Sequence, residues 1–180
     1  FNPNPGMTQL MSKEEKQDFI NAYGITQWIC LKFNQELAQM PAKQFVEHVL
    51  CQKLHSKSII VGDDFHFGHL QQGDFQLLQN MSQKQDFVAL QARTVQHQGR
   101  RISSSWLRQV LTDGDLKLAS QLLGRPYSMQ GIVQSGAQRG RQLGFPTANI
   151  DIKRQFSPLQ GVFVVSTQLS WQGDTHHYYG

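Results

Sequence analysis

The sequence predicts an α/β domain over residues 1–124, followed by an all-β domain over residues 125–180. Up to Gly124, segments with helical periodicity alternate with short runs of β-branched and aromatic residues, which favours an open, mostly parallel sheet with helices on its faces. After Gly124 the helical periodicity is lost and glycines separate short strand-like runs. Ligands of open parallel sheets bind beyond the carboxyl ends of the strands, so functional residues are expected in the loops that follow them.

Helices of the first domain are predicted from capping signals and apolar periodicity. Ser12 and Glu15 have the spacing of a capping box, and Gly24 is a typical C-terminal stop. Pro41 is a favourable start for a second helix, in which apolar residues recur on one side up to residue 54. Further helices are predicted near residues 75–78, from 104 to 111 and from 115 to 123.

Strands are predicted where β-branched and aromatic residues cluster between turn signals. These runs are residues 25–33, 58–61 and 87–95 in the first domain, and residues 127–134 and 162–171 in the second. The run 58–61 is predicted to be a buried strand. All of these apolar runs are far too short to cross a bilayer, so the sequence excludes a membrane-spanning helix.

The composition excludes a disordered or collagen-like chain, because 39% of the residues are hydrophobic and only 17% are charged. The formal net charge of +4 suits anionic partners such as phosphates, nucleotides or nucleic acid. Cys30 and Cys51 lie in apolar segments and are too few for a disulfide framework or a four-ligand zinc site. We interpret them as reduced core residues of a cytoplasmic protein.

The first candidate anion site is the segment from Arg101 to Arg108, where a run of serines precedes a predicted helix. The first N–H groups of a helix are unpaired and carry partial positive charge, so an anion binds there readily. The hydroxyls of Ser104 and Ser105 add donors, and the two arginines would converge on the same helix end as a triphosphate clamp. The alternative is an ordinary serine cap with solvated arginines.

The second candidate is the loop of residues 62–68, which follows the predicted strand 58–61. Asp64 could accept a hydrogen bond from a hydroxyl or an amine of a ligand. Phe65 and Phe67 could form an apolar wall or stack on a planar ring. The alternative is a turn that places two phenylalanines in the core.

The third candidate is the glycine-rich segment of residues 136–150. Gly140 and Gly144 would let the backbone approach a phosphate closely, and Arg141 supplies positive charge. Thr147 and Asn149 carry neutral oxygens that suit Mg²⁺ and its phosphate ligands. The segment is not a Walker A loop, because it has no Gly-Lys-Ser/Thr. The alternative is a basic loop between two strands.

In this order, these segments resemble the prokaryotic bifunctional riboflavin kinase/FMN adenylyltransferase family, the FAD synthetases. The resemblance covers essentially the whole chain and is strongest over residues 122–127 and 131–150, with further support from residues 1–5, 62–68 and 101–105. It implies a Rossmann-like nucleotidyltransferase domain over residues 1–124, which transfers AMP from ATP to FMN and gives FAD and pyrophosphate. It also implies a β-barrel riboflavin kinase domain over residues 125–180, which makes FMN from riboflavin with ATP and Mg²⁺.

The resemblance also implies roles for individual residues. The ATP phosphates of adenylyl transfer would be held by Arg101, Ser104, Ser105 and Arg108. The flavin side of the same site would involve Pro3, Pro5, Asp64 and Phe67. In the kinase part, ATP would be covered by Gly140, Arg141, Gly144, Phe145 and Pro146. Mg²⁺ and phosphate would be contacted by Thr147 and Asn149.

The sequence departs from the family pattern in places. Asn4 stands between two prolines where the family often has His, and Ser105 stands where Thr is usual. The family's His-x-Gly-His motif, which stabilises charge at the reacting phosphorus, lies before the matched segment, and the catalytic Glu of the kinase lies after it. We therefore expect a fragment that lacks the first strand of the sheet and part of the barrel, and that is inactive alone in both reactions.

Two other functions remain open at this point. One is a nucleic-acid-binding module that uses Arg139 and Arg141, whose affinity would fall steeply with salt and would show no flavin preference. The other is a generic ATP-binding α/β domain, which would bind ATP without binding any flavin.

Overall fold

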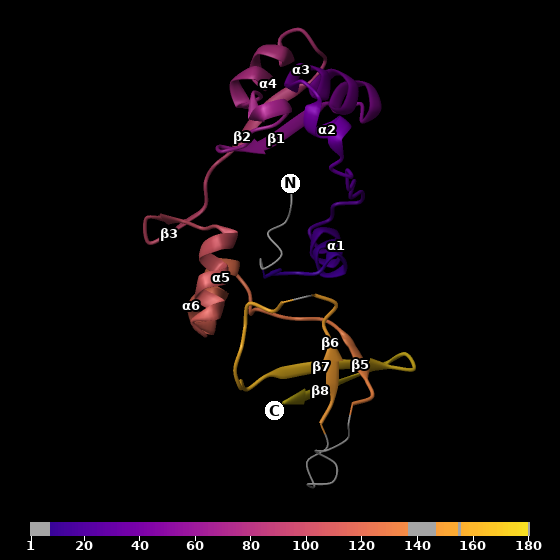
Figure 1. The fold of residues 1–180 in the computed structure, drawn as a ribbon, viewed down its shortest axis with the longest axis vertical. Coiled ribbons are helices and arrows are strands. Elements are labelled where there is room, and N and C mark those ends of the chain that lie inside the picture. The colour runs from indigo at the N-terminus through magenta and orange to yellow at the C-terminus, as the bar shows by residue number, and fades with distance from the viewer. Residues whose placement is uncertain (1–7, 137–146, 155, 180) are drawn as a thin grey trace. The chain divides into compact units, whose positions relative to one another are not determined.

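The computed structural model describes residues 8–136, 147–154 and 156–179 (Figure 1). These residues form two compact units. Unit 1 comprises residues 20–102, and unit 2 combines residues 8–19 with those from 103 onward. Both are built from helices and small sheets, so the chain is mixed α/β.

Unit 1 contains short helices and two small sheets. Its helices are α2 (Gln35–Gln39), α3 (Ala42–Gln44), the π-helix η1 (Phe45–Lys53), the 3₁₀ helix η2 (His69–Gln71) and α4 (Phe75–Ser82). Its strands are β1 (Ser58–Gly62), β2 (Val88–Ala92), β3 (Gln96–His97) and β4 (Arg100–Arg101). β1 pairs with β2 in parallel, and β3 pairs with β4 in an antiparallel hairpin. The parallel β1–β2 pair agrees with the prediction of a parallel sheet in the first domain. The described strands of unit 1 form only two-stranded sheets, however, so the larger open sheet is not confirmed.

Unit 2 combines helices with antiparallel strand pairs. Helix α1 (Lys13–Ala22) begins in this unit, and its last residues, 20–22, belong to unit 1. The other elements are α5 (Ser104–Thr112), α6 (Leu116–Leu123), β5 (Ile132–Gln134), β6 (Asn149–Asp151), β7 (Ser166–Trp171) and β8 (Asp174–Tyr179). β5 pairs with β6, and β7 pairs with β8. All described strands after Gly124 are thus antiparallel, as in an all-β segment.

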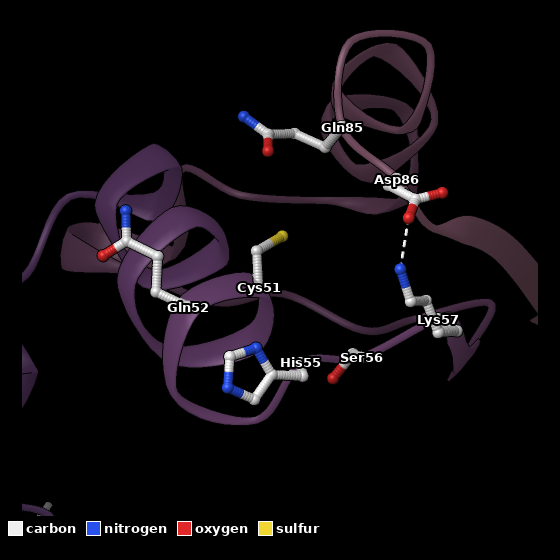
Figure 2. A pocket seen from close by; sticks show the side chains of 7 residues that line it. All are labelled: Cys51, Gln52, His55, Ser56, Lys57, Gln85 and Asp86. Atoms are coloured by element: carbon white, nitrogen blue, oxygen red, sulfur yellow. Dashed lines mark hydrogen bonds and ion pairs between the residues drawn. The ribbon is translucent and has the colours of Figure 1, made fainter.

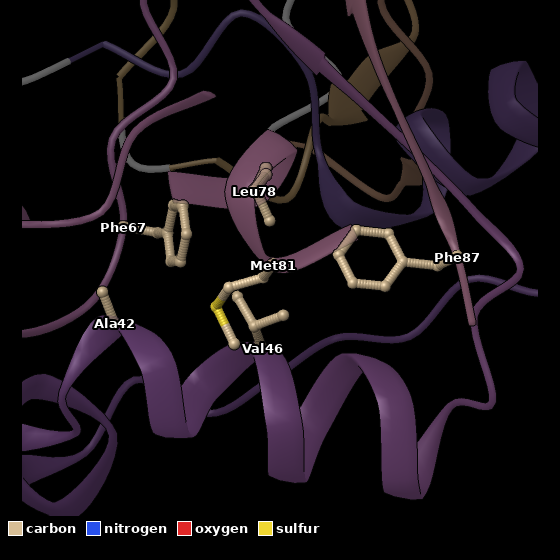
Figure 3. Close-up of a cluster of buried hydrophobic side chains, with 6 residues drawn as sticks. All are labelled: Ala42, Val46, Phe67, Leu78, Met81 and Phe87. Atoms are coloured by element: carbon tan, nitrogen blue, oxygen red, sulfur yellow. The ribbon is translucent and has the colours of Figure 1, made fainter. Parts of the chain in front are cut away.

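The core of unit 1 lies between α3, η1 and α4 and one face of the β1–β2 pair. Figure 3 shows its buried side chains pointing toward one another: Ala42, Val46, Phe67, Leu78, Met81 and Phe87. Ile59, Val61 and Ala89 pack against this cluster, whereas Ile60 and Leu90, on the opposite face, are exposed. The run 58–61 is therefore a strand buried on one face only, because helices of unit 1 cover only that face. In unit 2, α5 and α6 bury Leu107, Val110, Leu111, Ala119 and Leu122.

The predicted helix ends are confirmed where local hydrogen bonds set them. The backbone N–H of Ser12 donates to Glu15 Oε2 at 2.6 Å, and the N–H of Glu15 donates to Ser12 Oγ at 3.1 Å, which is a capping box. Gly24 and Gly124 follow α1 and α6 with φ of +77° and +69°, values that glycine adopts without steric cost. Asp115 caps α6 by accepting from the N–H of Leu118 at 2.9 Å.

Predictions that depended on distant partners were less accurate. Residues 25–33 form no strand, and Ile25, Ile29, Leu31 and Phe33 are about half exposed. A strand needs a neighbour for its backbone N–H and C=O groups, and the described strands pair only with one another. The strands β5 and β7 are also shorter than predicted. Cys30 lies in this exposed segment, so its assignment to the core was wrong, while Cys51 is half-buried and both thiols are free.

Gly68 is required by a close approach of two backbone segments. Its φ is +76°, and a Cβ at this position would lie 2.5 Å from Ala42 Cα. We expect Gly68→Ala to lower the free energy of unfolding of unit 1 by about 2 kcal/mol, because it combines left-handed strain with overpacking. Gly24→Ala is the matched control, with φ +77° and nothing within 4 Å of the added Cβ, and it should cost only about 1 kcal/mol. Equal losses in urea titrations of the two variants would contradict the close approach.

Candidate functional site

Polar side chains gather in unit 1 beyond the carboxyl ends of β1 and β2. Asp63 and Asp64 follow directly after β1, and Thr94 follows β2. The last residues of the two parallel strands, Gly62 and Ala92, are paired with each other, so both loops leave the sheet at the same edge. This is the edge at which open parallel sheets bind ligands.

Arg101, from strand β4, connects these loops. Its Nη1 donates to Asp63 Oδ1 at 3.1 Å, and its Nη2 lies 2.6 Å from Asp64 Oδ2. The hydroxyl of Thr94 donates to the other carboxylate oxygen of Asp63. We call Asp63, Asp64, Thr94 and Arg101 the edge cluster. It joins the loop after β1, the loop after β2 and the β3–β4 hairpin.

The contacts within the edge cluster favour the charged forms of Asp63 and Arg101. The pKa of Asp63 is lowered, first by the hydrogen bond from Thr94 and then by the positive charge of Arg101. The pKa of Arg101 is raised, chiefly by its hydrogen bond to Asp64. Asp63 is therefore an anion and Arg101 a cation at neutral pH. The guanidinium group has five N–H donors, so an anionic ligand can bind it while at least one carboxylate contact remains.

The serine run lies at the start of α5 in unit 2, as predicted. Ser103 is the N-cap residue and accepts from the N–H of Trp106 at 3.2 Å, so the cap itself is a residue that the sequence analysis did not single out. Ser104 and Ser105 form the first turn, and both are exposed. Their hydroxyls and the helix end are thus accessible to an anion. Arg101 belongs to unit 1, so its convergence with the serines on one phosphate group stays a prediction.

Arg108 has a partner within unit 2. Its Nε donates to the backbone oxygen of Thr8 at 2.8 Å, so one N–H of this guanidinium binds the segment before α1. Its role as a second arm of the phosphate clamp stays a prediction.

The two phenylalanines of the loop 62–68 have different surroundings. Phe67 is only 8% exposed and belongs to the core of unit 1, with its ring centroid 5.8 Å from that of Phe45. Phe65 stacks on it at 5.4 Å and is 38% exposed. The alternative of a turn with core phenylalanines therefore describes Phe67, and Phe65 is the ring that a ligand reaches more easily. The flavin contact of Phe67 stays a prediction.

Thr147 and Asn149, the predicted magnesium and phosphate ligands, are both exposed. Asn149 opens strand β6, opposite Gln134 of β5. Its side-chain amide lies against Gly136, where a Cβ would collide with it. Outside the described residues lie the other predicted site residues: Pro3, Pro5, Gly140, Arg141, Gly144, Phe145 and Pro146.

A pocket of about 490 Å³ lies at the opposite edge of the β1–β2 pair, before the strands begin. Figure 2 shows Cys51 from η1 and His55 from the segment that follows it, together with Lys57 and Asp86, which form an ion pair. No predicted site residue lines this pocket. It is therefore separate from the edge cluster, which follows the carboxyl ends of the same strands.

The two thiols should differ in reactivity. The pKa of Cys51 is raised by desolvation and, to a smaller extent, by the negative charge of Glu47, so little thiolate is present at pH 7.5. Cys30 is exposed. We expect iodoacetamide to modify Cys30 first, as followed by peptide mass spectrometry, with Cys30→Ser and Cys51→Ser as controls. Faster modification of Cys51 would contradict its environment.

Asp63 and Thr94 are members of the edge cluster that the sequence did not single out. Asp63 adjoins Asp64 directly after a strand, and Thr94 follows the next predicted parallel strand, so the strand pattern contained a signal for both. What the pattern lacked was the pairing register, which brings together side chains 31 residues apart.

Residues 1–106 match the family model of the FAD synthetases, and residues 123–179 match that of the riboflavin kinases. The first match covers more than half of the chain. The chain belongs to the FAD synthetase family. The resemblance seen in the sequence is thereby confirmed.

Curated relatives of this FAD synthetase family chain align with most of its length. It is 43% identical over 153 residues to a bifunctional riboflavin kinase/FMN adenylyltransferase of Pseudomonas fluorescens, covering 83% of this chain and 49% of the relative. It is 38% identical over 165 residues to the protein of that name in Escherichia coli K12, covering 92% of this chain and 53% of the relative. The chain thus spans about half the length of these relatives.

A solved structure is also similar in fold. It is described as a macrolide-efflux protein from Streptococcus pneumoniae, and it aligns with a TM-score of 0.78 and 27% identity over 96% of this chain and 55% of that one. Within the described parts of this FAD synthetase family chain, we find no helix with the length and apolar character needed to cross a membrane.

Proposed function

We propose that the protein carrying this chain makes FAD in two steps. It phosphorylates riboflavin to FMN with ATP, and it then transfers AMP from a second ATP to FMN, releasing pyrophosphate. The observation that carries this proposal is the presence of both family matches in one chain, in the order of the named bifunctional relatives. ATP, riboflavin and FMN are accordingly its small-molecule substrates.

The proposal divides the chain near residue 124 into a Rossmann-like nucleotidyltransferase domain and a β-barrel kinase domain. The parallel β1–β2 pair with helices on one face supports the first assignment. The antiparallel pairs β5–β6 and β7–β8 support the second. Two free thiols support a cytoplasmic location.

We assign ATP-phosphate binding for adenylyl transfer to Arg101, Ser104, Ser105 and Arg108. In this reaction a phosphate oxygen of FMN attacks the α-phosphorus of ATP, and the bond to pyrophosphate breaks. Negative charge on the phosphate oxygens must be stabilised, and positioned cations and helix N–H groups do this without covalent chemistry. Support comes from the position of Arg101, whose guanidinium contacts the loop that follows β1, and from the exposed serines at the start of α5. Asp64, beside Arg101, is assigned to the flavin side.

The kinase step is assigned to the segment that contains Thr147 and Asn149. The two residues fit a Mg²⁺–ATP complex, because they present neutral oxygens that leave the triphosphate to balance the charge of the ion. The absence of a side chain at Gly136 leaves room for the Asn149 amide. When bound, Mg²⁺ would neutralise charge on the phosphates, while Thr147 and Asn149 orient the complex.

The test is a product assay on the protein that carries this chain. Riboflavin with ATP and Mg²⁺ should give FMN and then FAD, and FMN with ATP should give FAD and pyrophosphate in equal amounts, as measured by chromatography and a pyrophosphate assay. ATP binding without any flavin binding would favour the generic ATP-binding domain instead. Binding to nucleic acid that falls steeply with salt, without flavin products, would favour the nucleic-acid module.

A further inference from the structure

We propose that Asp63 is a positioning residue for adenylyl transfer, which holds the Arg101 guanidinium in place while Asp64 gives up its contact with Arg101 when substrate binds. This inference rests on the proposed function, because it assigns the work of Arg101 to ATP-phosphate binding. It concerns only unit 1, in which all four members of the edge cluster lie.

Asp63 is attached at both of its carboxylate oxygens. Oδ1 accepts from Arg101 at 3.1 Å, and Oδ2 accepts from the hydroxyl of Thr94. Thr94 follows strand β2, which is paired along its length with β1, the strand that precedes Asp63. The carboxylate therefore bridges two loops that the sheet itself keeps in register. A side chain fixed at two points has little freedom to lose when it orients a third group.

Asp64 has the closer contact with Arg101 but is the more exposed of the two carboxylates. It contacts Arg101 through Oδ2 at 2.6 Å, and its side chain is 66% exposed, compared with 42% for Asp63. The two neighbouring carboxylates therefore differ in surroundings although they share one cation. This difference favours Asp63 as the fixed partner and Asp64 as the exchangeable one.

The charge balance explains why one contact is given up. Two carboxylates and one guanidinium leave the edge cluster with an excess of negative charge, and a triphosphate adds more. An arriving phosphate competes with the carboxylates for the N–H donors of Arg101, and the more exposed partner is displaced at lower cost. Asp63 remains because Thr94 stabilises its anionic form.

The experiment measures both reactions of the protein that carries this chain. Asp63→Asn should raise the KM for ATP in FAD formation about two- to fivefold, the effect of one partly exposed ion pair, with FMN formation and melting temperature unchanged. Thr94→Val should shift the same KM in the same direction, and Thr94→Ser, which keeps the hydroxyl donor, should restore it. A merely structural role would not produce this division between KM and stability.

A double-variant cycle shows whether Asp63 acts through Arg101. In an Arg101→Ala background, Asp63→Asn should cause no further change in the KM for ATP, because the group that it positions is gone. Asp86→Asn is the matched control: Asp86 also pairs with a cation, Lys57, but at the opposite edge of the same strands, and this variant should leave both reactions unchanged.

The possible failures are distinguishable. If Arg101→Ala itself leaves FAD formation intact, the proposed role of Arg101 is wrong and this inference is wrong with it. If Arg101→Ala weakens FAD formation but Asp63→Asn does nothing, only the positioning role is wrong. The same conclusion follows if the two effects multiply in the double variant, or if Asp63→Asn lowers the melting temperature and impairs both reactions alike.

Discussion

Replacing Arg154 by methionine is expected to lower the free energy of unfolding of unit 2 by about 3–5 kcal/mol, because it leaves a buried carboxylate without its cation. Arg154 forms an ion pair with Glu15, and their side chains are 0% and 5% exposed. Nη1 of Arg154 also donates to the backbone oxygen of Leu10 at 3.0 Å and to the hydroxyl of Tyr127 at 3.1 Å. Burial of Tyr127 raises the pKa of its hydroxyl, which therefore stays protonated.

The hydrogen bonds of Glu15 explain why removing its partner Arg154 lowers the free energy of unfolding. Its Oε1 accepts from the N–H of Gln130 at 2.6 Å, and its Oε2 accepts from the N–H of Ser12 at 2.6 Å. These bonds hold the carboxylate in place, so it cannot turn toward water when Arg154 is removed. The double variant Glu15→Gln with Arg154→Met removes both charges and should recover part of the lost stability.

Hydrogen exchange gives the sharpest measurement for this prediction, because it separates the two units. Peptides from residues 8–19 and 127–134 should lose protection in Arg154→Met, while peptides from residues 58–92 in unit 1 should not. Lys153→Met is the matched control, since Lys153 is exposed and adjacent in sequence. If the Arg154 and Lys153 variants are equally stable, the buried ion pair contributes nothing to unit 2.

This ion pair also shows that the compact units and the family matches divide the chain differently. Glu15 lies in the segment matched to the FAD synthetases, and Arg154 in the segment matched to the riboflavin kinases. Their contact spans 139 residues of sequence and places the first part of α1 in unit 2. The boundary predicted near residue 124 reflects the loss of helical periodicity along the sequence. Such periodicity does not show which distant segments pack together.

Features that depend on residues close together in the sequence were predicted correctly, whereas features that depend on distant partners were predicted less well. The capping box of Ser12 and Glu15 depends on residues three apart, and it was predictable in full. The run 25–33 has strong β-propensity, but a strand also needs a partner, and propensity does not supply one. The location of the edge cluster followed from the parallel pairing of β1 and β2. The contacts within the cluster could not be predicted in this way. The hydrogen bond between Thr94 and Asp63 depends on the strand register and on side-chain packing.

Arg101→Ala combined with Ser104→Ala is expected to reduce kcat/KM for FAD formation about 100-fold while sparing FMN formation. The physical reason is that both changes remove groups assigned to ATP phosphates in one reaction only. Initial rates measured separately, with FMN and ATP or with riboflavin and ATP, show the two steps apart. Ser120→Ala is the matched control for the serine, because Ser120 donates to the backbone of its own helix, α6.

Thr147→Ala or Asn149→Ala should have the reverse effect in the same protein, slowing FMN formation while FAD formation from added FMN continues. Thr175→Ala, an exposed threonine of strand β8, is the control for this pair. The two sets of variants together test whether each half of the chain has its own nucleotide site. If both sets impair the same step, the assignment of two separate nucleotide sites is wrong. Two separate sites would require each set of variants to slow a different reaction.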